Sequence, residues 1–163
     1  MNNKLAIIGA GGHGKVVGEI ASLNRYKVIN FFDDRAKEIK DFPFSIIDNF
    51  DYLKDHLKDY DAFFVALGDN QTRSEKIEWL KKNIVSLVHP KSTISKFSSI
   101  GTGTCVMANA VINAGCLIKE GVIINTSASV DHDCIIDDFA HISPNCSLSG
   151  NVNIGKFTHL GTG

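Results

Sequence analysis

The sequence predicts a doubly wound α/β domain with a parallel sheet, followed by an all-β parallel β-helix. Two observations predict this combination. Strand and helix signals alternate through the first half of the 163-residue chain, and an aliphatic residue then recurs at every sixth position. We place the boundary between the two patterns so that the domains are residues 1–86 and residues 87–163.

Short apolar runs alternate with helix-like spacing in the first domain. The runs predict strands, and apolar residues three or four positions apart predict helices. Strands that alternate with helices form βαβ units, so the sheet is expected to be parallel. The expected strands are 5–8, 28–32, 45–47, 62–67 and 84–88, and the expected helices are 16–23, 50–57 and 74–82.

The second domain is defined by a six-residue period. Each repeating aliphatic residue is followed, four positions later, by a small or β-branched residue. This period fits neither an α-helix nor an alternating strand and is typical of a parallel β-helix, whose coils pack on one another. The thirteen aliphatic residues are Val88, Ile94, Ile100, Val106, Ile112, Ile118, Ile124, Val130, Ile136, Ile142, Leu148, Ile154 and Leu160.

Three hexapeptides are expected to form one triangular coil, so residues 18 apart would stack in interior columns over about four coils. The four cysteines lie in this half without a CxxC pair, which favours reduced core residues over a zinc or redox site. We expect glycines to permit the turns between faces. The glycines expected at these turns are Gly101, Gly103, Gly155 and Gly161.

A glycine-rich loop links the first expected strand to the first helix. It reads Gly9-Ala10-Gly11-Gly12-His13-Gly14, and Asp33 and Asp34 follow about 20 residues later at the end of the second strand. This is the dinucleotide-binding context of a Rossmann-like domain, where glycines let the backbone approach a pyrophosphate. The pattern indicates phosphate binding without naming the nucleotide. The alternative is a tight turn that binds no ligand.

A second loop, residues 68–73, follows the buried fourth strand. Ligands of open parallel sheets bind outside the carboxyl ends of the strands, so both loops and the two aspartates are expected to face one crevice. Arg73 either contacts phosphate there or begins a helix. The sequence leaves both interpretations open.

The segment Asp131-His132-Asp133 carries the strongest catalytic signal. His132 lies two positions after an aliphatic column residue, so its side chain can point outward. An imidazole beside a carboxylate is suited to general-base catalysis, because the acid fixes the tautomer and supports the developing positive charge. The alternative is a solvated surface histidine. A metal site with Asp137 and Asp138 would lack a fixed ligand spacing, so we predict no metal.

Composition excludes several functional classes. The formal net charge is −1 and no basic cluster is present, which argues against nucleic-acid binding. No apolar run approaches the roughly 20 residues of a membrane span. The N-terminus has neither the apolar region nor the cleavage site of a signal peptide. We therefore expect a cytoplasmic protein without membrane insertion.

Taken in order, the motifs of the whole chain resemble one family. They are GAGGHGK, the two aspartates after the second strand, GDNxxR, VHPxxxI and NTxxxVDHD within the hexapeptides. This set is similar to the bacterial sugar acetyltransferases that include UDP-4-amino-sugar N-acetyltransferases and sialic acid O-acetyltransferases. The resemblance implies a left-handed β-helix and a homotrimer with acetyl-CoA between adjacent β-helices. It also implies further coils after Gly163, so we expect the chain to be a truncated form.

The resemblance further implies roles for single residues. His132 would deprotonate the acceptor, with Asp133 as its partner, and Asn125 would contact the acceptor sugar. His141 would lie near the acetyl group, and the Gly150 N–H would stabilise the thioester oxyanion. The remaining substrate-binding residues, for the uridine diphosphate, would be Gly11, Gly12, His13, Gly14, Asp33, Asp34 and Arg73.

The sequence therefore predicts an enzyme that transfers acetyl from acetyl-CoA directly to the amino group of a UDP-linked amino sugar, for bacterial glycan synthesis. Sialic acid O-acetylation stays open, because an imidazole base serves both acceptors. An NAD-dependent oxidoreductase would explain the glycine loop but not the hexapeptides. A non-catalytic nucleotide-sugar sensor is the third alternative.

Overall fold

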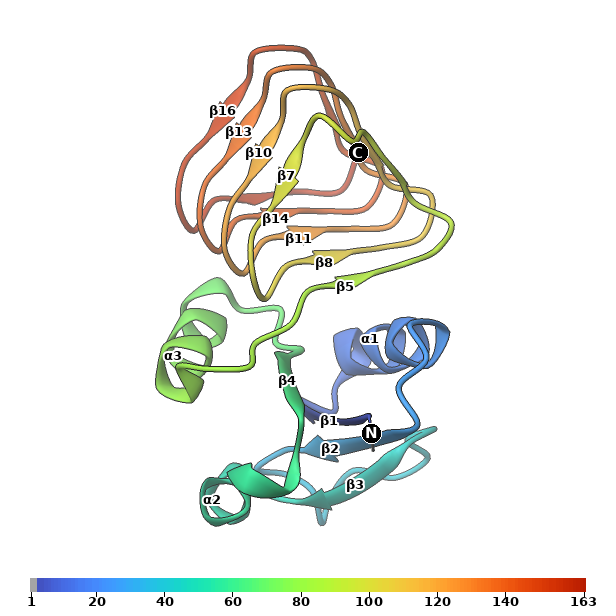
Figure 1. Cartoon of the computed structure of the whole chain (residues 1–163), viewed down its shortest axis with the longest axis vertical. Coiled ribbons are helices and arrows are strands. Elements are labelled where there is room, and N and C mark those ends of the chain that lie inside the picture. The colour runs from blue at the N-terminus through green and yellow to red at the C-terminus, as the bar shows by residue number, and fades with distance from the viewer. Residues whose placement is uncertain (1–2) are drawn as a thin grey trace.

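The computed structural model describes residues 3–163, which form an α/β domain followed by a triangular β-helix (Figure 1). The chain passes only once from the first domain into the second within these residues. The first domain holds four parallel strands in the order β3-β2-β1-β4. The predicted parallel sheet is confirmed. Its elements are β1 (Lys4–Ile8), α1 (Gly12–Leu23), β2 (Val28–Phe32), β3 (Ser45–Asp48), α2 (Phe50–Asp55), the 3-10 helix η1 (Leu57–Asp59), β4 (Ala62–Val65) and α3 (Asn70–Leu80).

Alternate side chains of the sheet enter two apolar layers. On one side, Leu5 and Ile7 pack with Val17 and Ile20 of α1, and this layer continues into Leu87 at the start of the β-helix. The other layer includes β1 and β4 side chains together with buried residues of α2 and α3. Helix α1 therefore lies between the sheet and the β-helix and contributes to the contact between the domains.

Several predicted boundaries differ from the structure, and two of the differences bear on the contact between the domains. The strand expected at 84–88 is divided, because Ile84 forms only a single parallel bridge to Phe63, whereas β5 (Leu87–Val88) pairs with the β-helix. Residues 84–88 are mainly apolar because they pack against both domains. Helix α3 begins at Asn70 rather than at 74, since the Asp69 carboxylate accepts the Thr72 N–H at 2.8 Å and caps the helix.

The β-helix consists of two-residue strands on three faces. We name the faces sheet B (β5, β8, β11, β14, β17), sheet C (β6, β9, β12, β15) and sheet D (β7, β10, β13, β16). Sheet B lies nearest the first domain (Figure 1). The strands are β6 (Thr93–Ile94), β7 (Ser99–Ile100), β8 (Cys105–Val106), β9 (Val111–Ile112), β10 (Leu117–Ile118), β11 (Ile123–Ile124), β12 (Ser129–Val130), β13 (Ile135–Ile136), β14 (His141–Ile142), β15 (Ser147–Leu148), β16 (Asn153–Ile154) and β17 (His159–Leu160).

Residues 18 apart pair in register, as the repeat predicts. Ile118 pairs with Ile100 on one coil and with Ile136 on the next. The small positions are buried at the corners, and the four cysteines are buried free thiols. The interior columns and the structural role of the cysteines are confirmed.

The turns use a position that the sequence did not predict. In every hexapeptide from residue 103 to residue 157, the residue before the small position has positive φ. Of the four glycines expected to permit turns, only Gly103 has positive φ. Gly101 is required for another reason, because a Cβ there would lie 2.5 Å from the Lys119 carbonyl carbon, and the expectation is wrong for Gly155 and Gly161. The position is more often occupied by other residues, including Asn109 and Phe139, because stacking holds each corner in the same shape.

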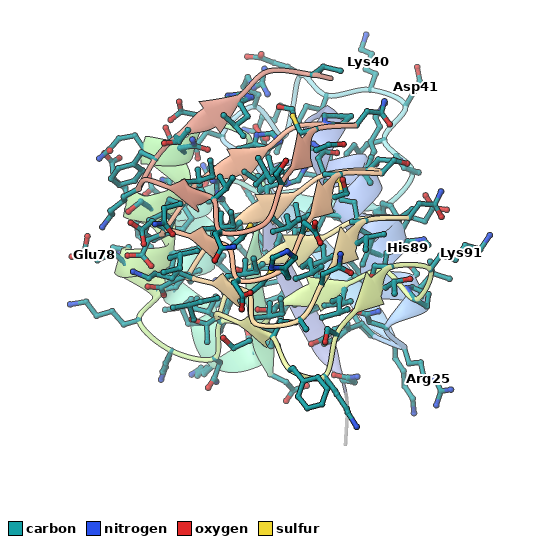
Figure 2. All side chains as sticks on the ribbon, turned by 90° about the horizontal axis from the view of Figure 1, so that it is seen from above. Arg25, Lys40, Asp41, Glu78, His89 and Lys91 are labelled. Atoms are coloured by element: carbon teal, nitrogen blue, oxygen red, sulfur yellow. The ribbon has the colours of Figure 1, made fainter. Side chains whose placement is uncertain are left out.

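Charged side chains such as Lys40, Glu78 and Lys91 extend away from the body of the molecule (Figure 2). Within residues 3–163, no helix has the length and apolar character needed to cross a membrane. The same residues contain no group of three or more His, Cys, Asp or Glu side chains arranged to hold a metal ion.

Candidate active site

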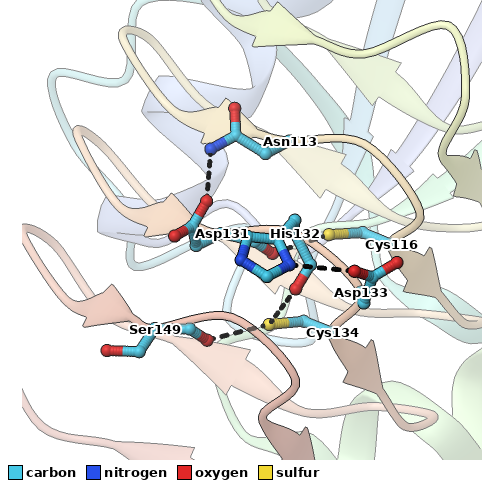
Figure 3. Close-up of polar contacts among 7 residues, drawn as sticks. All are labelled: Asn113, Cys116, Asp131, His132, Asp133, Cys134 and Ser149. Carbon is cyan, nitrogen blue, oxygen red and sulfur yellow. Dashed lines mark hydrogen bonds and ion pairs between the residues drawn. The ribbon is translucent and has the colours of Figure 1, made fainter.

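His132 lies directly after β12, on the corner between sheets C and D (Figure 3). Its side chain is 54% exposed, and its Nδ1 lies 2.8 Å from Oδ2 of Asp133. Because an ionised carboxylate only accepts hydrogen bonds, Nδ1 carries the proton and Nε2 presents a free lone pair. The corner thus holds an imidazole oriented for accepting a proton.

Two carboxylates act on this imidazole. The hydrogen bond to Asp133, followed by the negative charge of Asp131, raises the pKa of His132 above 6.5. Asp131 is itself held by Asn113 of the preceding coil, whose Nδ2 donates to Oδ1 at 2.8 Å (Figure 3). Asn113 was not among the predicted site residues. Its position 18 residues before Asp131 is the signal that could have identified it.

Gly150 lies one coil beyond His132 at the same corner. A Cβ atom at Gly150 would lie 2.5 Å from both Cε1 and Nε2 of the His132 ring, so only glycine leaves the imidazole this position. The Gly150 N–H has no acceptor among residues 3–163. The structure therefore brings together the predicted residues His132, Asp133 and Gly150, with a free N–H donor beside a free imidazole nitrogen.

A second cluster lies on sheet B, beside the first domain. The Asn125 side chain lies 2.9 Å from Nε2 of His141, and the His141 ring stacks on His159 with centroids 4.5 Å apart. Burial is the main cause that lowers the pKa of His141 to about 4, helped by the charges of His159, Arg73 and His13. His141 is therefore neutral near pH 7.

His13 faces the same junction from the first turn of α1. Burial and the charge of Arg73 lower the pKa of His13 to about 4. Among residues 3–163, His13 Nε2 and His141 Nδ1 are buried without a hydrogen-bond partner. Two neutral imidazoles, one from each domain, thus offer unpaired nitrogens at the domain junction.

The two clusters lie on different corners of the β-helix. Asn125 follows β11 at the corner between sheets B and C, whereas His132 lies at the corner opposite sheet B. One face of the triangle separates them (Figure 1). Within one chain, the structure does not bring Asn125 and His141 to His132.

The glycine loop presents an open helix N-terminus. Gly11 is the N-cap of α1 without a side-chain cap, and the space around Gly11 and Gly12 is open for a ligand. Gly14 instead packs tightly against the Gly9 carbonyl, so it shapes the loop. The loop therefore keeps N–H donors available for an anion.

The two aspartates brace the loops around a crevice. Asp33 accepts the Ala10 N–H at 2.9 Å, and Asp34 accepts the Phe50 N–H at 3.1 Å. They line a pocket of about 280 Å³ at the carboxyl ends of the strands. Thr72, from the loop 68–73 that was expected to face the crevice, lines this pocket as well. Phe50 of α2 and Lys76 of α3 also line it and were not predicted, because no motif links them.

Arg73 does not face this crevice. The side chain is 1% exposed, and all its guanidinium N–H groups donate to protein oxygens in both domains. The predicted phosphate contact is wrong, because no donor is left for a ligand. The alternative, that Arg73 begins a helix, agrees with its place in the first turn of α3.

Known proteins share both domains. Residues 4–80 match the family model described as PglD N-terminal domain. The acetyltransferase domain of PglB from Neisseria gonorrhoeae FA1090, solved with acetyl coenzyme A, is 45% identical, with TM-score 0.92 over 100% of this chain and 81% of that chain. A mutant perosamine N-acetyltransferase from Caulobacter crescentus, solved with CoA and GDP-perosamine, is 32% identical, with TM-score 0.90 over 98% of this chain and 78% of that one.

This chain belongs to the PglD-type family of bacterial sugar acetyltransferases. The family resemblance inferred from the motifs is confirmed, as is the combination of a parallel α/β sheet with a β-helix. A curated relative, UDP-N-acetylbacillosamine N-acetyltransferase from Bacillus subtilis (strain 168), is 35% identical over 115 residues. The match spans 64% of this chain and 51% of that relative, so the chain aligns with about half of its length.

We predict that Gly150→Ala lowers the turnover number about 100-fold, because a methyl group displaces the His132 ring. Steady-state CoA release with a thiol reagent measures this. Gly155→Ala is the matched control, since its nearest contact to a Cβ would be 3.8 Å away. Equal activity of the two variants would contradict the requirement for glycine at 150.

A second prediction concerns pH. Since His132 must be deprotonated to act, kcat/KM should rise with pH, with a midpoint above 6.5. Asp133→Asn removes the main cause of the raised pKa, so the midpoint should move to lower pH and the plateau should fall. The pH–rate profile from about pH 5.5 to about pH 8.5 checks this. Asp137→Asn, whose carboxylate pairs with Lys119, should leave the midpoint unchanged.

Proposed function

We propose that the protein transfers the acetyl group of acetyl-CoA to the amino group of a nucleotide-linked amino sugar, in bacterial glycan synthesis. The observation that carries this proposal is the His132 corner, where Asp133 fixes Nδ1 and Nε2 lies free above Gly150. The geometry suits direct transfer without an acetyl-enzyme. Cys134 lies buried inside the β-helix, so it is not available as a nucleophile.

The proposed reaction needs only these groups. The sugar amine attacks the thioester carbonyl carbon, and Nε2 of His132 takes the proton that the nitrogen loses. The Gly150 N–H donates to the carbonyl oxygen as negative charge develops on it. The carbon–sulfur bond then breaks, and the departing thiolate takes the proton from the imidazolium. The raised pKa of His132 strengthens it as the base.

The acceptor is held by the first domain in this proposal. Residues 1–86 bind the nucleotide through the open N-terminus of α1 and the pocket beside Asp33 and Asp34. The sugar then extends toward the unpaired nitrogens of His13 and His141. Residues 87–163 supply the acyl-transfer site. We assign a UDP-linked amine as the acceptor, because the relative from Bacillus subtilis is named for a UDP sugar.

We further propose that the enzyme is a homotrimer with its active sites between copies. A sugar held beside Asn125 lies one face away from His132 of the same chain. A cyclic arrangement solves this, because it places the B–C corner of each copy against the C–D corner of the next. Sheet C would then face the symmetry axis. Its outward residues are Thr93, Val111, Ser129 and Ser147, which are small enough for close packing.

The central test is release of CoA from acetyl-CoA in the presence of UDP-4-amino sugars, GDP-4-amino sugars or sialic acid. We expect release with the UDP-linked amine. His132→Ala should lower turnover about 100-fold or more. His56→Ala, which removes a remote histidine stacked on Tyr52, is the matched control and should keep full activity.

Three results of this assay would reject parts of the proposal. Release only with sialic acid would reassign the acceptor to a hydroxyl group. No release with any acceptor, together with a thermal shift by UDP sugars but not by acetyl-CoA, would indicate a sensor. Turnover of His132→Ala within a few-fold of the unmodified protein would remove His132 from the mechanism.

The assembly gives a separate prediction. Ser129→Arg places a long cation on sheet C, where Ser129 contacts Ser147 at 3.1 Å, and should convert the trimer to monomers. Ser99→Arg makes the same change on sheet D and should leave the trimer intact. Light scattering during size-exclusion chromatography measures both masses. Loss of the trimer only in Ser99→Arg would contradict this proposal, because it would place the interface on sheet D instead of sheet C.

A further inference from the structure

Two side chains of α3 donate hydrogen bonds to the equivalent main-chain carbonyl on each of three successive coils. Arg73 Nε donates to the Gly121 carbonyl and Arg73 Nη2 to the Phe139 carbonyl, each at 2.8 Å. Asn70 Nδ2 donates to the Phe157 carbonyl at 2.9 Å. The three acceptors are 18 residues apart, and all are turn residues with positive φ. The N-terminus of α3 is therefore fastened along the edge between sheets D and B.

The other donors of Arg73 hold the wall of the nucleotide crevice. Nη1 donates to the carbonyls of Leu67 at 3.0 Å and Gly68 at 3.2 Å. Leu67 lines the crevice beside Gly9 and Asp33. One guanidinium thus joins the crevice wall to the β-helix through direct hydrogen bonds.

Burying the charged guanidinium of Arg73 costs free energy, which favours a specific role for this contact. Burial lowers the pKa of Arg73 to about 10, and the charge is bound by carbonyl and amide oxygens rather than by a carboxylate. A buried cation is weak evidence for stability, because apolar packing often serves as well. Fixing one arrangement among several is the best-supported use of such groups.

The repeat makes a choice of arrangement necessary. Each coil offers the same carbonyl about 4.8 Å from the next, so the hydrogen bonds alone fit more than one position along the β-helix. Ile77 removes this ambiguity. Its Cδ1 lies 2.9 Å from a Cβ built at Gly103, so glycine there leaves room for Ile77. At Gly121 the Phe139 ring lies closest to the built Cβ, and Ile77 Cδ1 lies 3.4 Å from it. The next two coils carry Phe139 and Phe157, whose rings stack 5.6 Å apart, so the edge is bulkier there.

We propose that Arg73, Asn70 and Ile77 form a register latch that positions the acceptor sugar. The latch holds the first domain at one coil of the β-helix, so that a sugar leaving the crevice meets His13, His141 and Asn125. This rests on the proposed function in the choice of ligand. Arg73 acts through the crevice wall, so it is a positioning residue and not a catalytic one.

The test compares UDP with a UDP-4-amino sugar in calorimetric titrations of the intact protein. Because Arg73 reaches the crevice wall only at the carbonyls of Leu67 and Gly68, Arg73→Gln should lower the affinity for UDP less than it lowers the extra affinity that the sugar adds. The extra affinity that the sugar adds, and kcat/KM for the acceptor, should fall about tenfold or more. The KM for acetyl-CoA and the midpoint of the pH profile should stay unchanged. A general disturbance of the folded structure would change them as well.

Leu53→Ala is the matched control for lost stability. Leu53 is fully buried in the core and makes none of the hydrogen bonds of the latch, so Leu53→Ala should lower the unfolding temperature without changing the extra affinity that the sugar adds. The latch proposal would be overturned if Arg73→Gln lost equal affinity for UDP and for the UDP-sugar. It would also be overturned if the extra affinity that the sugar adds did not change. If Arg73→Gln does not fold, Asn70→Ala removes the hydrogen bonds to the last coil and one acceptor of Arg73, and should change the same quantities by a smaller factor.

A ligand-free measurement separates the latch from the proposed function. Spin labels at Asp51→Cys and Lys91→Cys report the distance between the two domains. We expect one narrow distance distribution that broadens or moves in Arg73→Gln. An unchanged distribution would reject the latch even if the protein acetylates sugars. A changed distribution in a protein that releases no CoA would support the latch and reject the acetyltransferase proposal.

Discussion

The hydrogen-bonded ladder between successive coils of the β-helix is the interaction on which the rest of the structure depends. It pairs residues 18 apart, so each corner collects side chains that are distant in the sequence. This is why Gly150 lies against the His132 ring and why Asn113 reaches Asp131. No separate scaffold is needed to place these groups, since neighbouring coils fix each other and two-residue strands leave little freedom between corners.

Most side chains that depend on this ladder could be placed from the sequence, whereas the role of Arg73 at the domain contact could not. The columns, the buried cysteines and the outward His132 follow from a six-residue count. Positive φ at Phe139 could not be predicted, because intrinsic preference disfavours it and stacking imposes it. The role of Arg73 was hidden for a different reason. Its partners are main-chain carbonyls, which any residue type supplies, so no side-chain pattern records them.

Two kinds of histidine result from this arrangement. His132 is exposed between carboxylates, which raise its pKa and make it a stronger base. Burial is the main cause that lowers the pKa values of His13 and His141, with a smaller effect of the nearby charge of Arg73, and it keeps both imidazoles neutral. A neutral imidazole can donate through one nitrogen and accept through the other, which suits recognition of a hydroxyl or amino group. In the proposed function, the same type of side chain therefore serves proton transfer at one corner and recognition at another.

A repeating surface creates a difficulty for any domain that docks on it. Equivalent atoms recur on every coil, so binding energy alone does not select one position. The chain breaks the repetition with side-chain volume, placing Gly103 and Gly121 on the first two coils of the edge and Phe139 and Phe157 on the next two. Ile77 packs against the two glycine coils. The turn geometry is the same at all four positions, so residue size at this edge determines which coil the nucleotide crevice faces.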